Sequence, residues 1–167
     1  MKIMFCGNDN TGKDYAAAML GIPYTSSSLI ALDAFVWENW GIAKYSNHDE
    51  CFEDRENHRD VWKTMIRAYS FHDETKLGRR IFANNDIYVG IRSATEFNAL
   101  KKAKVFDLSM WLDSSGWNTP SPNESNEITP DMCDWVINNN GTKEELELEM
   151  MVVKRRLEDW RTTPYGR

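Results

Sequence analysis

The stretch that decides the fold is residues 3–14, which run Ile-Met-Phe-Cys-Gly-Asn-Asp-Asn-Thr-Gly-Lys-Asp. Its first four residues are apolar and are followed at once by a glycine, which predicts a short, buried, parallel strand. Strong helix formers come after the lysine, including three consecutive alanines at 16–18. Gly7 to Lys13 therefore fit the pattern G-x-x-x-x-G-K between a strand and a helix, the context that gives this pattern meaning.

This spacing predicts a loop that binds phosphate. Glycines let backbone N–H groups converge on an anion, and the start of the following helix adds a partial positive charge. The lysine supplies a point charge to the β- and γ-phosphates of a nucleotide. We therefore expect ATP to be held by the following residues: Gly7, Asn8, Asp9, Asn10, Thr11, Gly12, Lys13 and Asp14.

Asp14 takes the place of the Ser or Thr that usually follows the lysine and ligates magnesium. A carboxylate is a good hard ligand for Mg²⁺, so Asp14 is the expected metal ligand, directly or through water. Alternatively, Asp14 does not bind the metal: Thr11 supports the loop, and Asp14 only caps the start of the helix, where a negative charge is favourable.

Along the rest of the chain, predicted strands alternate with predicted helices. This alternation predicts a three-layer α/β fold, with a mostly parallel sheet flanked by helices, in a single domain over 1–167. Strands are expected at 3–6, 86–91, 105–112 and 135–137, and helices at 12–19, 29–40, 53–71, 94–104 and 142–160. Residues 50–82 form an expected helical insertion, and 114–130, with three of the five prolines, an expected lid-like loop.

The composition is that of an ordinary globular protein, 41% hydrophobic and 28% charged, with a net charge of -6. No apolar run is long enough to span a bilayer, and Met1 to Cys6 lacks the features of a signal peptide, so we expect a cytoplasmic protein without a membrane partner. An acidic chain is a poor default binder of nucleic acid. The sequence is compatible with a monomer or a homodimer.

Three segments carry a resemblance to a known family. Thr11-Gly12-Lys13-Asp14 ends the loop, Gly90 to Glu96 places an arginine four residues before a glutamate, and Asp134 to Thr142 joins an apolar strand to Asn-Asn-Asn-Gly-Thr. In these segments the chain resembles the bacteriophage deoxynucleoside monophosphate kinases, which are P-loop proteins related to the adenylate and dephospho-coenzyme A kinases. The resemblance follows the order of elements along most of the chain.

The resemblance implies the three-layer P-loop NTPase fold and ATP-dependent, Mg²⁺-dependent phosphorylation of a small nucleotide. It assigns Arg92 to stabilising the transferring group and places Asn139 and Gly141 near the adenine. The chain departs from the family at Gly90, where an acid is expected. It departs again in 114–130, which contains no Arg or Lys for a lid that closes over the phosphates.

An acceptor phosphate needs arginines, because a guanidinium fork matches that anion. The segment 50–82 supplies the expected acceptor-binding residues: Arg55, Arg59, Trp62 as a base-stacking group, and Arg67.

Two other functions are consistent with the same residues. A kinase that phosphorylates 5-hydroxymethyluracil in phage DNA would need a catalytic base, for which Asp33 is the first candidate and Asp9 the second. A nucleotide-binding regulator without kinase activity would fit the departures at Asp14 and Gly90.

Overall fold

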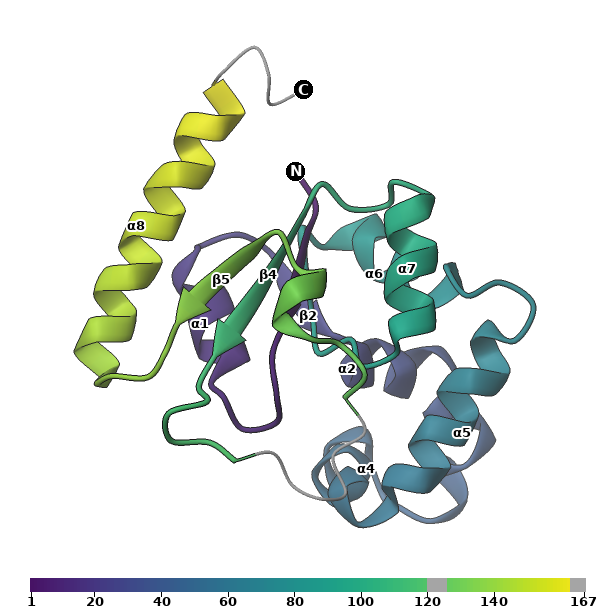
Figure 1. Cartoon of the computed structure of the whole chain (residues 1–167). Coiled ribbons are helices and arrows are strands. Elements are labelled where there is room, and N and C mark those ends of the chain that lie inside the picture. Colours follow the sequence, from purple (N-terminus) through teal and green to yellow (C-terminus); the bar gives the residue numbers. More distant parts are fainter. Residues whose placement is uncertain (120–125, 163–167) are drawn as a thin grey trace.

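Five parallel strands form the central layer of the computed structural model, which describes residues 1–119 and 126–162 (Figure 1). The strands are β1 (Ile3–Cys6), β2 (Tyr24–Ser26), β3 (Ile87–Val89), β4 (Leu108–Asp113) and β5 (Trp135–Asn138). Their order in the sheet is β2-β3-β1-β4-β5, and every neighbouring pair is parallel. The first strand thus lies in the middle, so the loop that follows it opens at the centre of the sheet's carboxyl edge.

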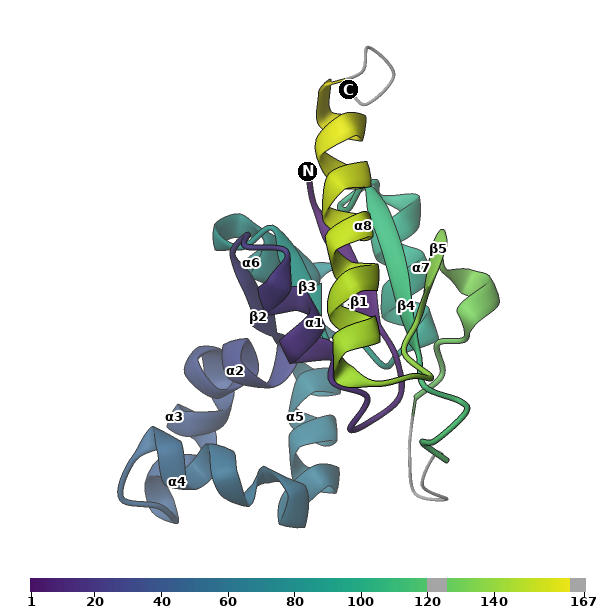
Figure 2. The ribbon, with the colours of Figure 1, turned by 90° about the vertical axis from the view of Figure 1, so that its left-hand side faces the viewer.

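One face of the sheet packs against α1 (Lys13–Met19) and α8 (Lys143–Thr162), which lie together on that face in Figure 2. Alternate strand residues such as Ile3 and Phe5 point to this face, because successive side chains of a strand point to opposite sides. They meet a helical stripe at Leu146, Met150, Val153 and Leu157. This stripe is the buried, apolar face of the last helix.

The other face packs against α6 (Lys76–Asn84) and α7 (Ala94–Lys102). Met4 and Cys6 of the first strand belong to this second core. The sheet is therefore buried on both sides, as the apolar runs of its strands predict, and the three-layer α/β architecture is confirmed.

Shorter helical segments lie between β2 and α6. They are α2 (Ser27–Ala31), a π-helical turn η1 (Leu32–Val36), α3 (Trp37–Asn39), the 3₁₀ turn η2 (Gly41–Ala43), α4 (His48–Glu53), the 3₁₀ turn η3 (Asp54–His58) and α5 (Arg59–Ser70). A further 3₁₀ turn, η4 (Pro130–Met132), precedes β5. Helices thus occupy most of the predicted insertion 50–82.

The predicted continuous helix over 53–71 is wrong, since η3 interrupts it. The Asp54 carboxylate accepts hydrogen bonds from Asn57 Nδ2 at 2.6 Å and from Tyr45 Oη at 2.7 Å, and this local network replaces helical bonding. His58 has a non-helical backbone with φ of −127°, so a new helix, α5, begins at Arg59. The break places Arg59 at the end of α5 that approaches the loop after β1.

Thr142 and Glu145 have the T-x-x-E spacing that predicts a capping box, and α8 begins with one. Thr142 N–H donates to Glu145 Oε2 at 2.7 Å, and Glu145 N–H donates to Thr142 Oγ1 at 3.2 Å. Among the described helices, none combines the length and apolar character that crossing a bilayer requires.

Truncating a buried side chain of a central strand should leave a cavity and lower the free energy of unfolding by a large amount. Leu112 on β4 is fully buried, so Leu112→Ala should lower the free energy of unfolding by about 2–5 kcal/mol. The matched control is Leu148→Ala on α8, where the side chain is 62% exposed and the cost should stay within about 0.5 kcal/mol. Urea denaturation measures both values; equal costs would contradict the two-core packing.

Candidate active site

The loop between β1 and α1 is shaped by residues with positive φ. Gly7 has φ of 150°, Asn10 of 57° and Gly12 of 80°. A Cβ at Gly7 would lie 3.0 Å from the Leu112 carbonyl oxygen, so a side chain at this position would press on the neighbouring strand β4. Backbone conformation therefore favours glycine at both glycine positions, and lack of space adds to this at Gly7 only.

Three asparagine amides from distant segments hold the loop by its carbonyl groups. Asn118 Nδ2 donates to Asp9 O at 2.7 Å, Asn139 Nδ2 to Thr11 O at 2.9 Å, and Asn126 Nδ2 to Gly7 O at 3.4 Å. Within the loop, Thr11 Oγ1 donates to Asn8 O at 3.0 Å. These bonds tie four carbonyl groups of the loop to side chains.

Asn118 and Asn126 were not expected from the sequence, because a loop asparagine carries no local signal of a partner more than 100 residues away. They flank residues 120–125, so the middle of the predicted lid lies outside the described residues. Asn139 and Gly141, expected near the adenine, follow β5 beside the loop; their role toward adenine stays a prediction.

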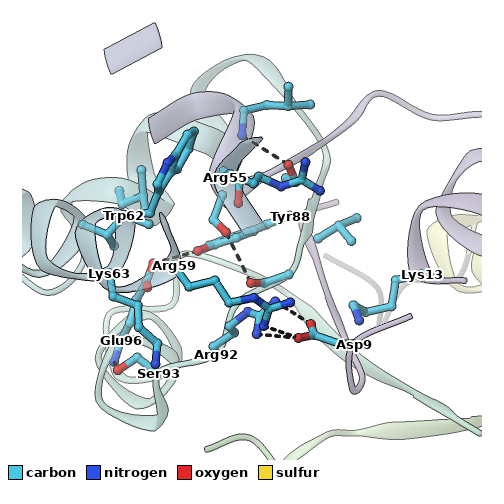
Figure 3. A pocket seen from close by; sticks show the side chains of 18 of the residues that line it. Asp9, Lys13, Arg55, Arg59, Trp62, Lys63, Tyr88, Arg92, Ser93 and Glu96 are labelled. Atoms are coloured by element: carbon cyan, nitrogen blue, oxygen red, sulfur yellow. Dashed lines mark hydrogen bonds and ion pairs between the residues drawn. The ribbon is translucent and has the colours of Figure 1, made fainter. Parts of the chain in front are cut away.

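A cavity of about 520 Å³ opens beside the loop, between the carboxyl edge of the sheet and α5 (Figure 3). Most of the predicted site residues line it. From the loop and α1 these are Asp9, Asn10, Lys13 and Asp14; from the helical insertion, Arg55, Arg59, Trp62 and Arg67; and from the segment after β3, Arg92. The fold thus brings together the predicted acceptor arginines and the predicted phosphate-binding lysine.

Asp9 joins two of these arginines, as Figure 3 shows. Its Oδ2 accepts from Arg59 Nη1 and from Arg92 Nη1, each at 2.9 Å, and its Oδ1 accepts from Arg92 Nη2. Burial opposes ionisation of this carboxyl, but the hydrogen bonds and charges of Arg59 and Arg92 outweigh burial and lower the pKa of Asp9. Asp9 is therefore a carboxylate at neutral pH, and a weakened base.

Lys13 folds back onto its own loop. Its Nζ donates to Asn8 O and lies 3.4 Å from Thr11 Oγ1. An ammonium group bonds a charged phosphate oxygen more strongly than a neutral carbonyl, so a bound phosphate would compete well for Lys13.

Trp62 is 4% exposed and packs in the core beside Phe52, with ring centroids 6.4 Å apart. It lines the cavity from α5, yet its burial shows a packing role. Stacking of this ring on a base stays a prediction.

The structure does not bring Asp33 to the cavity, contrary to its expected role as a base. Asp33 lies on η1, whose buried side is formed by Leu32, Phe35 and Val36. Its side chain is 67% exposed, and Oδ1 lies 3.4 Å from His48 Nδ1. The η1 core holds Asp33 on the solvent side, so the geometry does not support it as a base in this cavity.

Asp14 is exposed in the first turn of α1, one residue after Lys13, and lines the cavity. Within residues 1–119 and 126–162, no three His, Cys, Asp or Glu side chains cluster as a metal site. Mg²⁺ commonly uses one or two carboxylates together with substrate phosphates and water, so a single accessible carboxylate fits a metal that arrives with a nucleotide.

Far from Lys13 in Figure 3, the cavity wall contains a buried acid. Glu96 on α7 is 7% exposed and accepts a hydrogen bond from Tyr88 Oη at 3.1 Å. Burial raises the pKa of Glu96 to about 7, while the Tyr88 hydrogen bond acts in the opposite direction. Glu96, four residues after Arg92 in the sequence, is therefore a buried carboxyl group that is partly protonated near pH 7.

The comparisons with known proteins find distant structural likeness. No family model matches the chain, and no curated protein matches it. A gluconokinase from Sinorhizobium meliloti is 12% identical, with a TM-score of 0.48 over 95% of this chain and 93% of its own. Shikimate kinases from Aquifex aeolicus and Bacteroides thetaiotaomicron are 13% and 8% identical, with TM-scores of 0.44 and 0.45, over 95% of this chain and 98% of theirs. Likeness this distant does not identify a substrate.

The buried Glu96 predicts a pH-dependent stability. In the folded chain the carboxyl keeps its proton up to about pH 7, whereas in the unfolded chain it ionises near 4.5. Unfolding therefore releases a proton between these values, and the Glu96 contribution to the free energy of unfolding is lost as pH rises from about 4.5 to about 7. Glu96→Gln should remove this loss, which amounts to roughly 1–3 kcal/mol.

Urea denaturation at pH 5 and pH 7.5 measures this effect. The matched control is Glu158→Gln on the exposed side of α8, which should keep the pH dependence of the unmodified chain. An identical pH dependence in Glu96→Gln and the unmodified chain would contradict the buried-acid assignment.

Proposed function

We propose that the chain is an ATP-dependent phosphotransferase whose acceptor is a small nucleotide, a deoxynucleoside monophosphate. One observation carries the proposal: the glycine-rich loop with Lys13 opens into the same cavity in which the guanidinium groups of Arg59 and Arg92 converge on Asp9. Donor and acceptor phosphates would thus meet across a single cavity.

The loop and the two arginines beside it suit the two phosphates of such a reaction. The loop amides and Lys13 would hold the β- and γ-phosphates of ATP, and Asp14 would hold Mg²⁺, which supplies positive charge against the phosphate oxygens. Arg59 and Arg92 would hold the acceptor phosphate, since guanidinium groups form paired hydrogen bonds with such anions. In such a complex the acceptor oxygen would face the γ-phosphorus.

Phosphoryl transfer requires the protein mainly to position the reactants and to stabilise charge, and it needs no covalent intermediate with the protein. An oxygen of the acceptor phosphate forms the new bond to the γ-phosphorus, the bond to the β–γ bridging oxygen breaks, and ADP leaves with that oxygen. The attacking oxygen is already anionic, so the acceptor needs no base. Arg92 would stabilise the charge of the transferring group from the acceptor side, because its guanidinium already lies at the loop.

A second candidate is phosphorylation of a hydroxymethylated pyrimidine in DNA, which needs a base for the hydroxyl group. With Asp33 outside the cavity, this candidate rests on Asp9, the carboxylate that the loop itself presents there. Its two arginine partners lower the pKa of Asp9 and weaken it as a base, which favours the nucleotide acceptor.

The direct test is transfer of label from γ-labelled ATP with Mg²⁺ to a panel of deoxynucleoside monophosphates, beside duplex DNA containing 5-hydroxymethyluracil. We expect label in at least one monophosphate and none in the DNA. Lys13→Ala should lower kcat at least about 100-fold, because an electrostatic contact to the transferring phosphate is lost. Arg155→Ala, on the exposed side of α8, is the matched cation control and should retain activity.

Label in the DNA alone would replace the proposal by the second candidate. ATP binding without transfer to any of these acceptors would contradict both and favour a nucleotide-binding regulator.

A further inference from the structure

Beyond the two arginines, the wall of the cavity contains two aromatic side chains and a carboxyl group. In Figure 3, Trp62, Tyr88 and Glu96 lie farther from Lys13 than the contact between Asp9 and the arginines does. Further apolar side chains that line the cavity are those of Leu29, Phe52, Ile66, Leu77 and Val89. Apolar walls with a few polar groups are typical of sites for small ligands. If the arginines hold the phosphate of a nucleotide, this wall is the surface that the cavity offers to its base.

Glu96 presents one oxygen to this space. Tyr88 Oη donates to Glu96 Oε1 at 3.1 Å, and within residues 1–119 and 126–162 no other hydrogen bond or ion pair holds the carboxyl group. In that part of the chain, the enclosed side-chain atoms without a hydrogen-bond partner are Trp62 Nε1 and Ser70 Oγ, so Glu96 Oε2 is accessible. Since Glu96 lines the cavity, Oε2 is the atom that a ligand there would contact.

The surroundings favour the neutral form of this carboxyl group. Burial raises the pKa of Glu96 to about 7, the charge of Glu74 acts in the same direction, and the Tyr88 hydrogen bond opposes both. Lys63 and Arg67 on α5 also line the cavity, but among the described residues neither pairs with Glu96. Because Oε1 accepts from Tyr88, the acid proton belongs on Oε2, which then donates into the cavity.

A neutral acid and a carboxylate select different groups on a base. The O–H group of the neutral acid donates to a carbonyl oxygen, which uracil, thymine and hypoxanthine carry. The exocyclic amino group of cytosine or adenine is a donor, so it pairs with the carboxylate instead. A bound base would then cover a negative charge that no cation balances, which is unfavourable. Pairing of the neutral acid with a carbonyl group avoids this cost.

We propose that Glu96 is a specificity-determining residue of the acceptor site: its Oε2 hydroxyl donates a hydrogen bond to a carbonyl oxygen of the base, so the site favours keto bases over amino bases. The inference rests on the proposed function for the position of the acceptor phosphate. It gives this buried acid, which phosphoryl transfer to a phosphate does not require, a role in choosing the substrate.

The test measures binding of two matched pairs of monophosphates to the full chain, with ADP and Mg²⁺ present to occupy the loop. The members dUMP and dCMP carry a keto or an amino group at the same position of a pyrimidine, and dIMP and dAMP do so on a purine. Isothermal titration calorimetry gives each dissociation constant at pH 6.5 and at pH 8. Both members of a pair carry the same phosphate, so the ratio of their dissociation constants cancels its ionisation.

At pH 6.5 we expect the keto member of at least one pair to bind about tenfold more tightly than the amino member, because a mismatched base leaves a buried polar group unpaired. At pH 8 this preference should fall roughly tenfold, because a carboxyl group with a pKa of about 7 has then lost its proton in most molecules.

Two variants separate the role of Glu96 from that of its surroundings. In Glu96→Gln, Tyr88 still has a carbonyl oxygen to donate to, so the amide nitrogen faces the cavity and remains a donor at either pH. This variant should therefore keep the keto preference at both pH values. Glu127→Gln changes an exposed carboxylate that lines the same cavity, and it should keep the pH dependence of the unmodified chain.

Three results would overturn the inference: keto members that bind no more tightly than amino members at pH 6.5, a preference in the unmodified chain that pH does not change, or a preference in Glu96→Gln that falls at pH 8. In each case monophosphates still bind and still take label from ATP, so the proposed function stands. If no monophosphate binds or takes label, the proposed function itself fails, and the inference fails with it.

Discussion

The path of the chain as it leaves β1 is the constraint on which the rest of the site depends. The central strand is buried by helices on both faces, so its carboxyl end is open only along the edge of the sheet. A Cβ on Gly7 would lie 3.0 Å from the Leu112 carbonyl oxygen on the neighbouring strand, so a side chain there would be crowded. The loop must therefore turn at once toward the cavity, and the three asparagine amides that hold its carbonyls fix where it lies.

The charge of the side chains that line the cavity differs from the charge of the chain as a whole. The protein as a whole has a net charge of -6, yet six cations and five carboxylates line the cavity described here. Four of these six cations are arginines, which come from η3, from α5 and from the segment after β3. Asp9 offsets part of this positive charge at the loop, where its carboxylate accepts hydrogen bonds from Arg59 and Arg92.

The sequence predicted the parts of this structure that depend on local pattern. The buried strand, the glycine loop and the Thr142–Glu145 capping box are each encoded within a few residues, and each is present. The break between α4 and α5 was missed, because it depends on side-chain bonds to Asp54 that compete with helix formation.

Contacts between distant residues were beyond prediction from one sequence. The arginines were predicted near an acceptor, and the structure places them in one cavity, but nothing in the pattern indicated that Asp9 would pair with Arg59 and Arg92. Asp33 follows Lys13 by twenty residues, and this spacing alone suggested a base near the loop. Its exposure is set by the packing of η1, which spacing alone does not encode.

The central claim is that the loop and the arginines bind two different phosphates in one cavity. A crystal structure with ADP, Mg²⁺ and a deoxynucleoside monophosphate tests it most directly. The account predicts the ADP phosphates against the loop amides and Lys13, with the monophosphate between Arg59 and Arg92 and the Asp9 carboxylate moved off at least one of them. A monophosphate bound outside the cavity, or one bound there with both Asp9–arginine contacts intact, would contradict it.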